Sequence, residues 1–191
     1  MPESSRTITF ATGNPGKIQE ARTILSPFGI DLVPFDGKGV EVQAESVSEV
    51  AAYSARAASR RFARALIVED AGLFVDSLQG FPGPFSSFVF KTLGIPGLLR
   101  LLEGQRSRTA TFRSAVAYCA PSSEPVVFDG SVGGRMLTVP RGSGGFGFDP
   151  VFVPKGERKS MAEMTLEEKC SVSHRGEALR KFAAWFVSTE R

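Results

Sequence analysis

Several features that mark particular classes of protein are scarce or missing in this sequence. Only two cysteines occur, Cys119 and Cys170, and they form no Cys-x-x-Cys pair, so neither a disulfide framework nor a zinc ribbon is indicated. No apolar run approaches the length of a membrane span, and the first residues contain no apolar signal region. We therefore expect a cytoplasmic protein without a membrane partner.

The common catalytic and nucleotide-binding signatures are missing as well. His174 is the one histidine of the chain and there is no Gly-x-Ser-x-Gly sequence, which disfavours a Ser-His-Asp hydrolase. The chain has neither the full spacing of a Walker P-loop nor a Rossmann glycine triplet, and it contains no internal repeat or linker. Any nucleotide site must therefore be built from less familiar elements.

The overall composition is that of an ordinary globular protein. The chain has 191 residues, of which 42% are hydrophobic and 23% charged, so we expect one domain over residues 1–191. The formal net charge is +3 and the sequence pI is about 9.1, values that admit a polyanionic partner. Composition does not separate a nucleic acid from a free nucleotide.

The first candidate site is a polar loop between a strand and a helix. Residues 7–11 are rich in β-formers, residues 12–17 read Thr-Gly-Asn-Pro-Gly-Lys, and residues 18–28 have helical periodicity. A helix N-terminus aimed at such a loop favours anions, and Lys17 adds a full positive charge. The alternative is a simple turn in which Asn14 tolerates a left-handed conformation.

The second candidate site is a pair of carboxylates. The short apolar run of residues 66–68 predicts a strand that ends at Glu69 and Asp70, and ligands of α/β proteins bind at the carboxyl ends of strands. Adjacent carboxylates repel each other unless a cation lies between them, so we expect Mg²⁺ here. The alternative is two surface acids in a turn.

The third candidate site is the glycine-rich stretch of residues 142–150. Phe146 and Phe148 share one side if this stretch is extended, which would form a platform for stacking a base. Asp149 would supply an acceptor for a base edge or a sugar hydroxyl. The alternative is a glycine-rich turn that leads into a buried strand, with both phenylalanines in the core.

Other residues complete the pattern. Lys169, His174 and Arg175 lie close together around a predicted helix start and fit a second anion or base-edge contact. Arginines at helical spacing, Arg56 among them, usually form a solvated face. The remaining elements that we expect are strands at 30–35, 109–119, 126–132 and 151–153, helices from about 47 to 64, at 85–93 and at 98–102, and a helix after Ser173.

Taken together and in this order, these motifs resemble the inosine triphosphate pyrophosphatase family, whose members hydrolyse non-standard purine nucleoside triphosphates. The resemblance rests on residues 12–17, 68–72, 80–83, 145–150 and 167–175 and runs from about Phe10 to Phe186. It favours the binding interpretation of residues 142–150 over the turn. It implies an α/β fold with a mixed, strongly twisted central sheet, flanking helices and two lobes around a deep nucleotide-binding cleft, usually as a homodimer.

The resemblance also implies a reaction and a role for each matching residue. Magnesium-dependent hydrolysis would convert the triphosphates of inosine, deoxyinosine and xanthosine (ITP, dITP, XTP) into the monophosphate and pyrophosphate, with Asp70 as general base. The matching residues are Glu41, Glu69 and Asp70 for Mg²⁺, Thr12, Asn14 and Lys17 for the phosphates, and Phe146, Phe148, Asp149, Lys169, His174 and Arg175 for base and sugar.

The sequence departs from the family at one position. Many members carry a lysine roughly where this chain has Ser54 or Arg56, and an inward-turned Arg56 could replace it on the triphosphate. Two other interpretations stay open. One is a non-catalytic nucleotide- or RNA-binding module, which leaves the acidic pair unexplained, and the other is a related pyrophosphatase for other modified or standard nucleotides.

Overall fold

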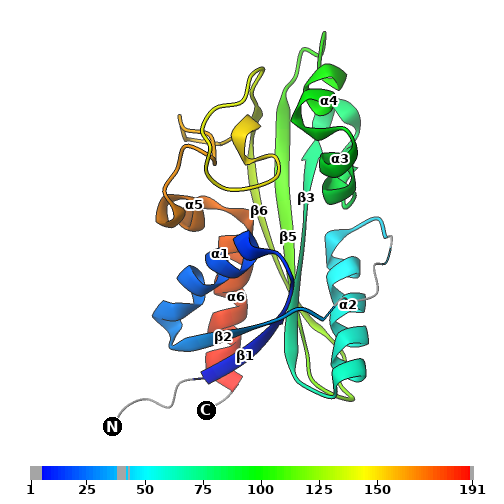
Figure 1. The fold of residues 1–191 in the computed structure, drawn as a ribbon, viewed down its shortest axis with the longest axis vertical. Helices are drawn as coiled ribbons and strands as arrows, with labels where there is room; N and C mark the ends of the chain where they lie inside the picture. The colour runs from blue at the N-terminus through cyan, green and yellow to red at the C-terminus, as the bar shows by residue number, and fades with distance from the viewer. Residues whose placement is uncertain (1–5, 38–41, 43, 190–191) are drawn as a thin grey trace.

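The computed structural model describes residues 6–37, 42 and 44–189, which form a mixed sheet flanked by helices (Figure 1). Of the seven strands formed by these residues, six follow the order β2-β1-β3-β5-β6-β7, and β4 pairs with β3 outside this path. A mixed α/β fold, as predicted, is confirmed. The strands are β1 (Arg6–Ala11), β2 (Ile30–Phe35), β3 (Leu66–Val75), β4 (Pro82–Gly83), β5 (Thr109–Cys119), β6 (Val126–Met136) and β7 (Phe152–Pro154), and the helices in the described ranges are α1 (Pro15–Leu25), α2 (Val47–Phe62), α3 (Ser86–Thr92), α4 (Gly94–Leu101), α5 (Leu166–Val172) and α6 (His174–Thr189).

Helix α1 begins three residues earlier than the periodicity predicts. The side chain of Asn14 accepts hydrogen bonds from the backbone N–H groups of Gly16 and Lys17, at 2.9 and 3.2 Å, so the helix starts directly after this cap. Pro15 at the first helical position has no N–H that needs a partner. Lys17 is therefore in the first turn, as expected.

Strand β3 is longer than predicted, and the expectation that it ends at Glu69 and Asp70 is wrong. Its antiparallel pairing with β5 runs without interruption from Leu66 opposite Cys119 to Val75 opposite Ala110. The parallel pairing with β1 covers only Leu66 and Ile67. Glu69 and Asp70 therefore lie in mid-strand, just beyond the carboxyl end of β1.

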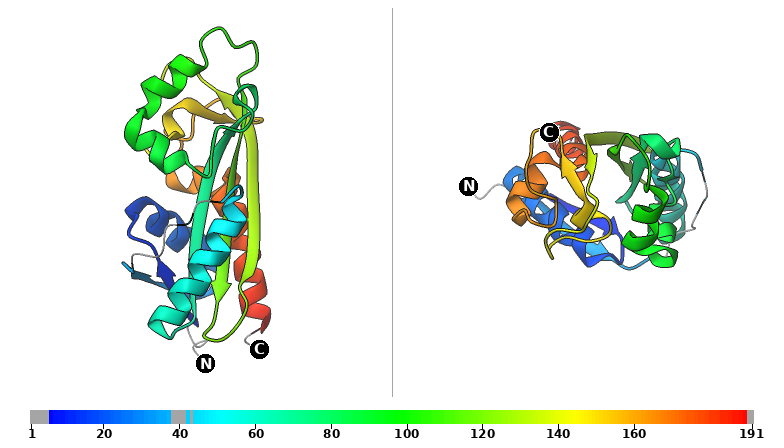
Figure 2. Two further views of the ribbon diagram at one scale, coloured as in Figure 1. Left: turned by 90° about the vertical axis from the view of Figure 1, so that its right-hand side faces the viewer. Right: turned by 90° about the horizontal axis from the view of Figure 1, so that it is seen from above.

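The two faces of the sheet are covered by different helices, which Figures 1 and 2 show on opposite sides of the long strands. On one face α1 and α6 bury a cluster that includes Ile8, Phe10 and Phe182. On the other face α2 packs its alanines on Leu66 and on small residues of β5. Because strand side chains alternate between faces, Ile67 and Glu69 belong to the first face, and Leu66 and Asp70 belong to the second.

The first face carries a second apolar cluster farther along β3. Leu73 and Val75 of β3 pack there with Phe112 of β5, Phe152 of β7 and Leu98 of α4. Between the two clusters the inward side chains of β3 and β5 are polar, namely Glu69 and Ser114, and both are buried. A polar layer thus separates two apolar cores on one face of the same sheet.

The connection between α3 and α4 is tighter than predicted. Gly94 begins α4 with a φ of 64°, and Pro96 lies in the first turn, where the missing N–H costs no helical hydrogen bond. The expected break over residues 94–97 is therefore mostly helix. None of the helices formed by the described residues combines the length and apolarity that crossing a bilayer requires.

Candidate functional site

An ionic layer fills the gap between the two apolar clusters, and its first members join the loop before α1 to α6. The ammonium of Lys17 lies 2.8 Å from Glu69 Oε2 and donates to the Glu69 backbone carbonyl at 2.8 Å. The other oxygen, Oε1, lies 3.1 Å from Arg175 Nε and accepts a 2.5 Å hydrogen bond from the hydroxyl of Ser114. Glu69 therefore has charged or polar partners on both oxygens.

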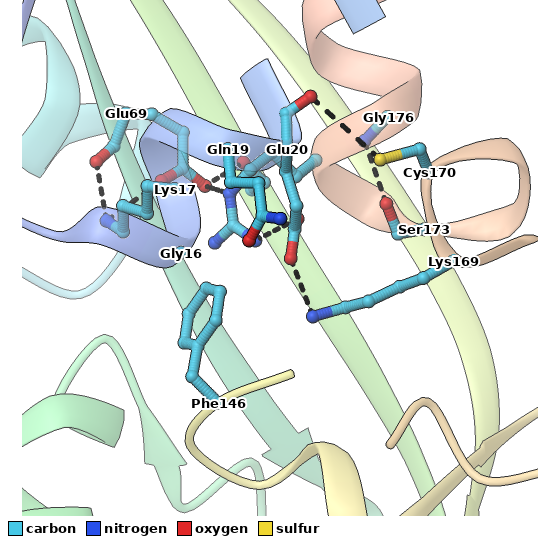
Figure 3. Close-up of polar contacts among 12 residues, drawn as sticks. Gly16, Lys17, Gln19, Glu20, Glu69, Phe146, Lys169, Cys170, Ser173 and Gly176 are labelled. Atoms are coloured by element: carbon cyan, nitrogen blue, oxygen red, sulfur yellow. Dashed lines mark hydrogen bonds and ion pairs between the residues drawn. The ribbon is translucent and has the colours of Figure 1, made fainter. Parts of the chain in front are cut away.

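The same layer continues from Arg175 toward the glycine-rich loop. Arg175 Nη1 lies 2.7 Å from Glu20 Oε2, and Lys169 Nζ lies 2.6 Å from Glu20 Oε1. Lys169 also pairs with Asp149, whose Oδ2 accepts a 2.7 Å hydrogen bond from the Phe146 N–H. Figure 3 shows Lys169 reaching Glu20 beside the Phe146 ring. We define the ionic layer as Lys17, Glu69, Arg175, Glu20, Lys169 and Asp149.

Charges of opposite sign alternate along this layer, and that order determines which groups are ionised. Burial alone would raise the pKa of Glu69, but Arg175 and Lys17 hold it far below its usual value. Arg175 and Lys169 likewise lower the pKa of Glu20 against the effect of burial. Glu69 and Glu20 in turn raise the pKa of Arg175, which stays charged although it is buried. Lys17, with a side chain 18% exposed, is the most accessible member.

Asp70 is next to Glu69 in the sequence but lies in a different environment. Neighbouring strand residues point to opposite faces, so the expectation that the two carboxylates share one cation stays a prediction. Lys17 nevertheless acts to lower the pKa of both carboxylates, so Asp70 lies within electrostatic reach of the loop before α1. Burial, with a smaller contribution from Glu69, raises the pKa of Asp70 to about 6 against the opposing effect of Lys17. Within the described residues, its Oδ2 is buried without a hydrogen-bond partner. Such an orphaned carboxylate oxygen fits a divalent cation, whereas the oxygens of Glu69 are already engaged.

The third predicted metal ligand, Glu41, lies outside the described residues. Within the ranges that the structure describes, no three acidic, histidine or cysteine side chains gather closely enough to hold a metal ion. Of the predicted metal ligands, Asp70 is therefore the one whose surroundings support the prediction.

The glycine-rich loop separates its two phenylalanines instead of aligning them. Gly145 and Gly147 have φ values of 67° and 62°, so the segment is turned, and the expectation of an extended platform is wrong. Phe148 is buried and makes an edge contact with Phe90. Phe146 is half-buried, and its ring faces the cations Lys169 and Arg175 at 4.6 and 5.2 Å.

The Phe146 ring of this loop packs against α1, the helix that carries Lys17. A Cβ atom at Gly16 would lie 2.4 Å from Cδ1 of Phe146, so only glycine allows the ring to come this close (Figure 3). The loop before α1 and the Phe146 ring are thus direct neighbours, although 130 residues separate Gly16 from Phe146 in the chain. Phe146, Asp149, Lys169 and Arg175 are brought together as predicted, whereas Phe148 belongs to the core.

The residues of the first loop are present but partly used for structure. Asn14 caps α1 with its side chain, and the Thr12 hydroxyl accepts a 3.2 Å hydrogen bond from the Asn14 N–H. These contacts shape the loop and leave the ammonium of Lys17 at its surface. The predicted phosphate ligands therefore divide into two residues that form the loop and one that carries the charge.

Arg56 pairs with a residue outside the predicted site. It lies on α2, and its guanidinium pairs with Glu124 in the connection between β5 and β6. The side chain is 40% exposed, and the ionic layer lies on the opposite face of the sheet. The prediction that Arg56 turns toward the triphosphate does not fit this pairing, and Ser54 lies on the same helix.

Three residues of the site were not predicted from the sequence. Glu20 holds Lys169 and Arg175, Ser114 donates to Glu69, and Phe112 stacks on the ring of His174. One signal for Glu20 is its position on the apolar side of α1, next to the buried Ala21 and Ile24. Ser114 interrupts an apolar alternation in β5, which is a weaker signal, and Phe112 is indistinguishable from a core residue.

Known proteins resemble this chain over nearly its whole length. The family model described as the Ham1 family matches residues 8–185. A dITP/XTP pyrophosphatase of Methanopyrus kandleri is 49% identical, with 94% of this chain and 95% of the relative covered, and one of Thermococcus kodakarensis is 47% identical over 93% and 96%. The solved structure of a HAM1 protein from Coxiella burnetii superimposes with a TM-score of 0.85 at 28% identity, covering 96% of this chain and 99% of the other. The order of the motifs, the mixed sheet and these relatives agree, and the chain belongs to the Ham1 family.

Proposed function

We propose that this protein hydrolyses the non-standard purine nucleoside triphosphates dITP, XTP and ITP to the monophosphate and pyrophosphate. The observation that carries the proposal is the ionic layer, which connects a cationic loop at Lys17 with an aromatic ring at Phe146. A nucleotide has charged phosphates at one end and a flat base at the other. The names of the relatives, dITP/XTP pyrophosphatase, support the same substrates.

The phosphates bind at the beginning of α1 in this proposal. Lys17 is the most accessible cation of the layer, and the helix N-terminus that Asn14 caps adds a favourable dipole for anions. In the free protein Glu69 neutralises Lys17. When a triphosphate binds, its phosphate oxygens take over part of the interaction that Lys17 makes with Glu69 in the free protein.

The base binds at the Phe146 ring. An aromatic ring gives a base a stacking partner without regard to its identity, so selection must come from the polar groups beside it. Lys169 and Arg175 face this ring, and His174 is adjacent to Arg175 at the start of α6. Donors aimed at the oxygens of hypoxanthine and xanthine would reject adenine and guanine, because mismatched polar groups are left unpaired.

Asp70 is the proposed general base and, with Glu41, the proposed ligand of Mg²⁺. Mg²⁺ held there would supply positive charge that stabilises the departing pyrophosphate. Asp70 orients a water molecule and takes its proton while the water oxygen attacks the α-phosphorus and the bond to pyrophosphate breaks. The raised pKa of about 6 suits a base that works near neutral pH.

A substrate panel tests the proposal. Pyrophosphate release is measured from dITP, ITP, XTP, GTP, ATP and modified pyrimidine triphosphates, with and without Mg²⁺. Fast release from the first three, dependent on Mg²⁺, is the expected result. Release chiefly from pyrimidine or standard nucleotides would favour a related pyrophosphatase, and nucleotide binding without any release would favour a non-catalytic module.

We also propose that the protein works in the cytoplasm as a homodimer. Exposed phenylalanines cluster around β4 and α3, among them Phe85 and Phe88, which are 42% and 66% exposed. Apolar side chains gathered in this way support a protein contact surface. Sedimentation of the native protein and of Phe88→Asp tests this, and a wild-type monomer would contradict it.

A further inference from the structure

His174 carries an unsatisfied group inside the site. Its side chain is 3% exposed, and its Nδ1 atom is buried without a hydrogen-bond partner in the described part of the chain. Burial, and then the nearby Arg175, keep the pKa of the imidazole well below its usual value, so the ring is neutral. A neutral imidazole has one donor nitrogen and one acceptor nitrogen, and which is which depends on their surroundings.

The backbone of His174 is held firmly at the first position of α6. Ser173 accepts a 3.0 Å hydrogen bond from the Gly176 N–H and so caps the helix. A Cβ atom at Gly130 of β6 would lie 2.1 Å from the His174 carbonyl oxygen, so strand and helix are in close contact here. The remaining freedom of His174 is the rotation of its side chain.

Phe112 restricts that rotation. Its ring is stacked on the imidazole with a centroid distance of 4.7 Å and an interplanar angle of 8°. Phe112 is itself buried and held at its edge by Phe152, with centroids 4.7 Å apart at an angle of 70°. An aromatic ring placed in this way supplies a flat surface and no hydrogen-bonding group, so it restricts the plane of the imidazole without pairing with either nitrogen.

We propose that Phe112 is a positioning residue for base selection: its ring, stacked on His174, fixes the plane in which the imidazole presents its nitrogens to the purine. The inference rests on the proposed function and adds to it a residue that does not touch the substrate. The orphaned Nδ1 and the stacked ring are explained together, because a fixed ring with an unused polar atom is ready for a ligand.

The test compares variants that keep or remove the flat ring. Phe112→Met retains much of the apolar volume and loses the plane, whereas Phe112→Tyr retains the plane. Phe128→Leu is the control, because Phe128 contacts Phe182 and Trp185 in the other apolar cluster and not His174. We measure thermal stability and kcat/KM for XTP and GTP in each.

The Met variant should lower the XTP to GTP ratio of kcat/KM by roughly ten- to a hundredfold, as small misplacements of a binding group do. The Tyr variant should restore the ratio, and the control should lose stability alone. A ratio unchanged in Phe112→Met, or lowered equally in Phe128→Leu, would overturn the proposal.

A second readout does not depend on activity. Because His174 is the one histidine of the chain, the imidazole nitrogen signals in an NMR spectrum of the untagged protein belong to it alone. At pH 7 the wild type should show one neutral tautomer, and Phe112→Met should show exchange between two. A wild type that already exchanges, or a Met variant that loses selectivity with an unchanged tautomer, would overturn the role of Phe112. Absence of XTP hydrolysis in the wild type would instead overturn the proposed function. The NMR spectra would then still test whether Phe112 fixes the plane of the His174 ring.

Discussion

The two faces of the sheet at β3 and β5 bury very different groups. Beneath α2 the contact is made by small apolar side chains, with Ala51, Ala55 and Ala58 packed against Ala115 and Ala117. On the opposite face, between two apolar clusters, the ionic layer places six charged groups among buried side chains. Apart from Asp70, which leaves β3 toward the side of α2, the sheet thus supports a packing surface of small apolar side chains on one side and a costly electrostatic structure on the other.

This difference separates stability from function. Alanines allow a helix to lie close to a sheet, and nothing further is needed to explain them. Buried ion pairs are often less stabilising than apolar residues of the same size, because desolvation offsets much of their attraction. We therefore attribute the ionic layer to ligand recognition, and the following changes test that attribution from the largest expected effect to the smallest.

Asp70→Asn should cause the largest loss of activity, and it should raise the free energy of unfolding. Loss of a general base lowers kcat by about 10²–10⁴-fold. Because the pKa of about 6 in the folded protein exceeds the ordinary aspartate pKa of 3.8, ionisation of Asp70 opposes folding, with no penalty below about pH 4 and the full penalty above about pH 6. The variant should therefore be more stable by about 2–3 kcal/mol at pH 8 and unchanged at pH 4. Turnover near the wild-type rate would contradict the assignment.

Glu20→Gln should be the most destabilising single change in the ionic layer. It leaves Lys169 and Arg175 buried with less negative charge, and breaking a buried pair costs about 3–5 kcal/mol. The control is Lys159→Met, which removes an ion pair with Glu168 whose side chains are about half exposed and should cost about 0–1 kcal/mol. Urea unfolding measures both. Equal losses would mean that the layer is no different from surface ion pairs.

Truncation of the two phenylalanines of the glycine-rich loop should affect different quantities. Phe146→Ala should raise KM by an amount corresponding to about 1–3 kcal/mol of base stacking and leave the free energy of unfolding nearly unchanged. Phe148→Ala removes a buried ring and should reduce stability by about 3–5 kcal/mol. If both changed only the melting temperature, the stacking role of Phe146 would be wrong.

Arg56→Ala should have the smallest effect. Its guanidinium pairs with the exposed Glu124, so the loss should be below about 1 kcal/mol, and kcat and KM should stay unchanged. Steady-state kinetics on XTP is the measurement. A marked rise in KM would return Arg56 to the phosphate site and contradict the position of its side chain.

Much of the fold could be predicted from the sequence because local signals and tertiary structure agree. The cap at Ser46 begins α2 where the sequence predicts a helix, because its side-chain oxygen accepts a hydrogen bond from the Glu49 N–H, and the β5–β6 hairpin follows from two β-rich runs around a turn. The cap at Asn14 was missed, so α1 begins three residues earlier than its periodicity predicts. The length of β3 was missed because its continuation beyond Val68 depends on pairing with β5, which local sequence does not encode.

The sequence predicted which residues belong to the site better than it predicted how they are arranged. Lys17, Phe146, Lys169 and Arg175 were found through motifs and do come together. Glu20 was missed because a lone glutamate on a helix is usually solvated, and its burial becomes visible only when α1 and α6 are packed. That Glu69 and Asp70 share one cation stays a prediction, because adjacent residues of a continuous strand leave it on opposite faces and Lys17 already pairs with Glu69.

The most direct test of the ionic layer as recognition machinery is the ratio of kcat/KM for XTP to that for GTP in Arg175→Lys. Lysine keeps the charge but lacks the forked donors that let Arg175 bind Glu20 and Glu69 at once. Both substrates carry the same triphosphate, so a change in the ratio reports on the base alone. We predict that the variant loses activity on XTP at least about tenfold more than on GTP, because mismatched polar groups discriminate strongly. Equal losses on both substrates would contradict the account and assign Arg175 to the phosphates or to the scaffold.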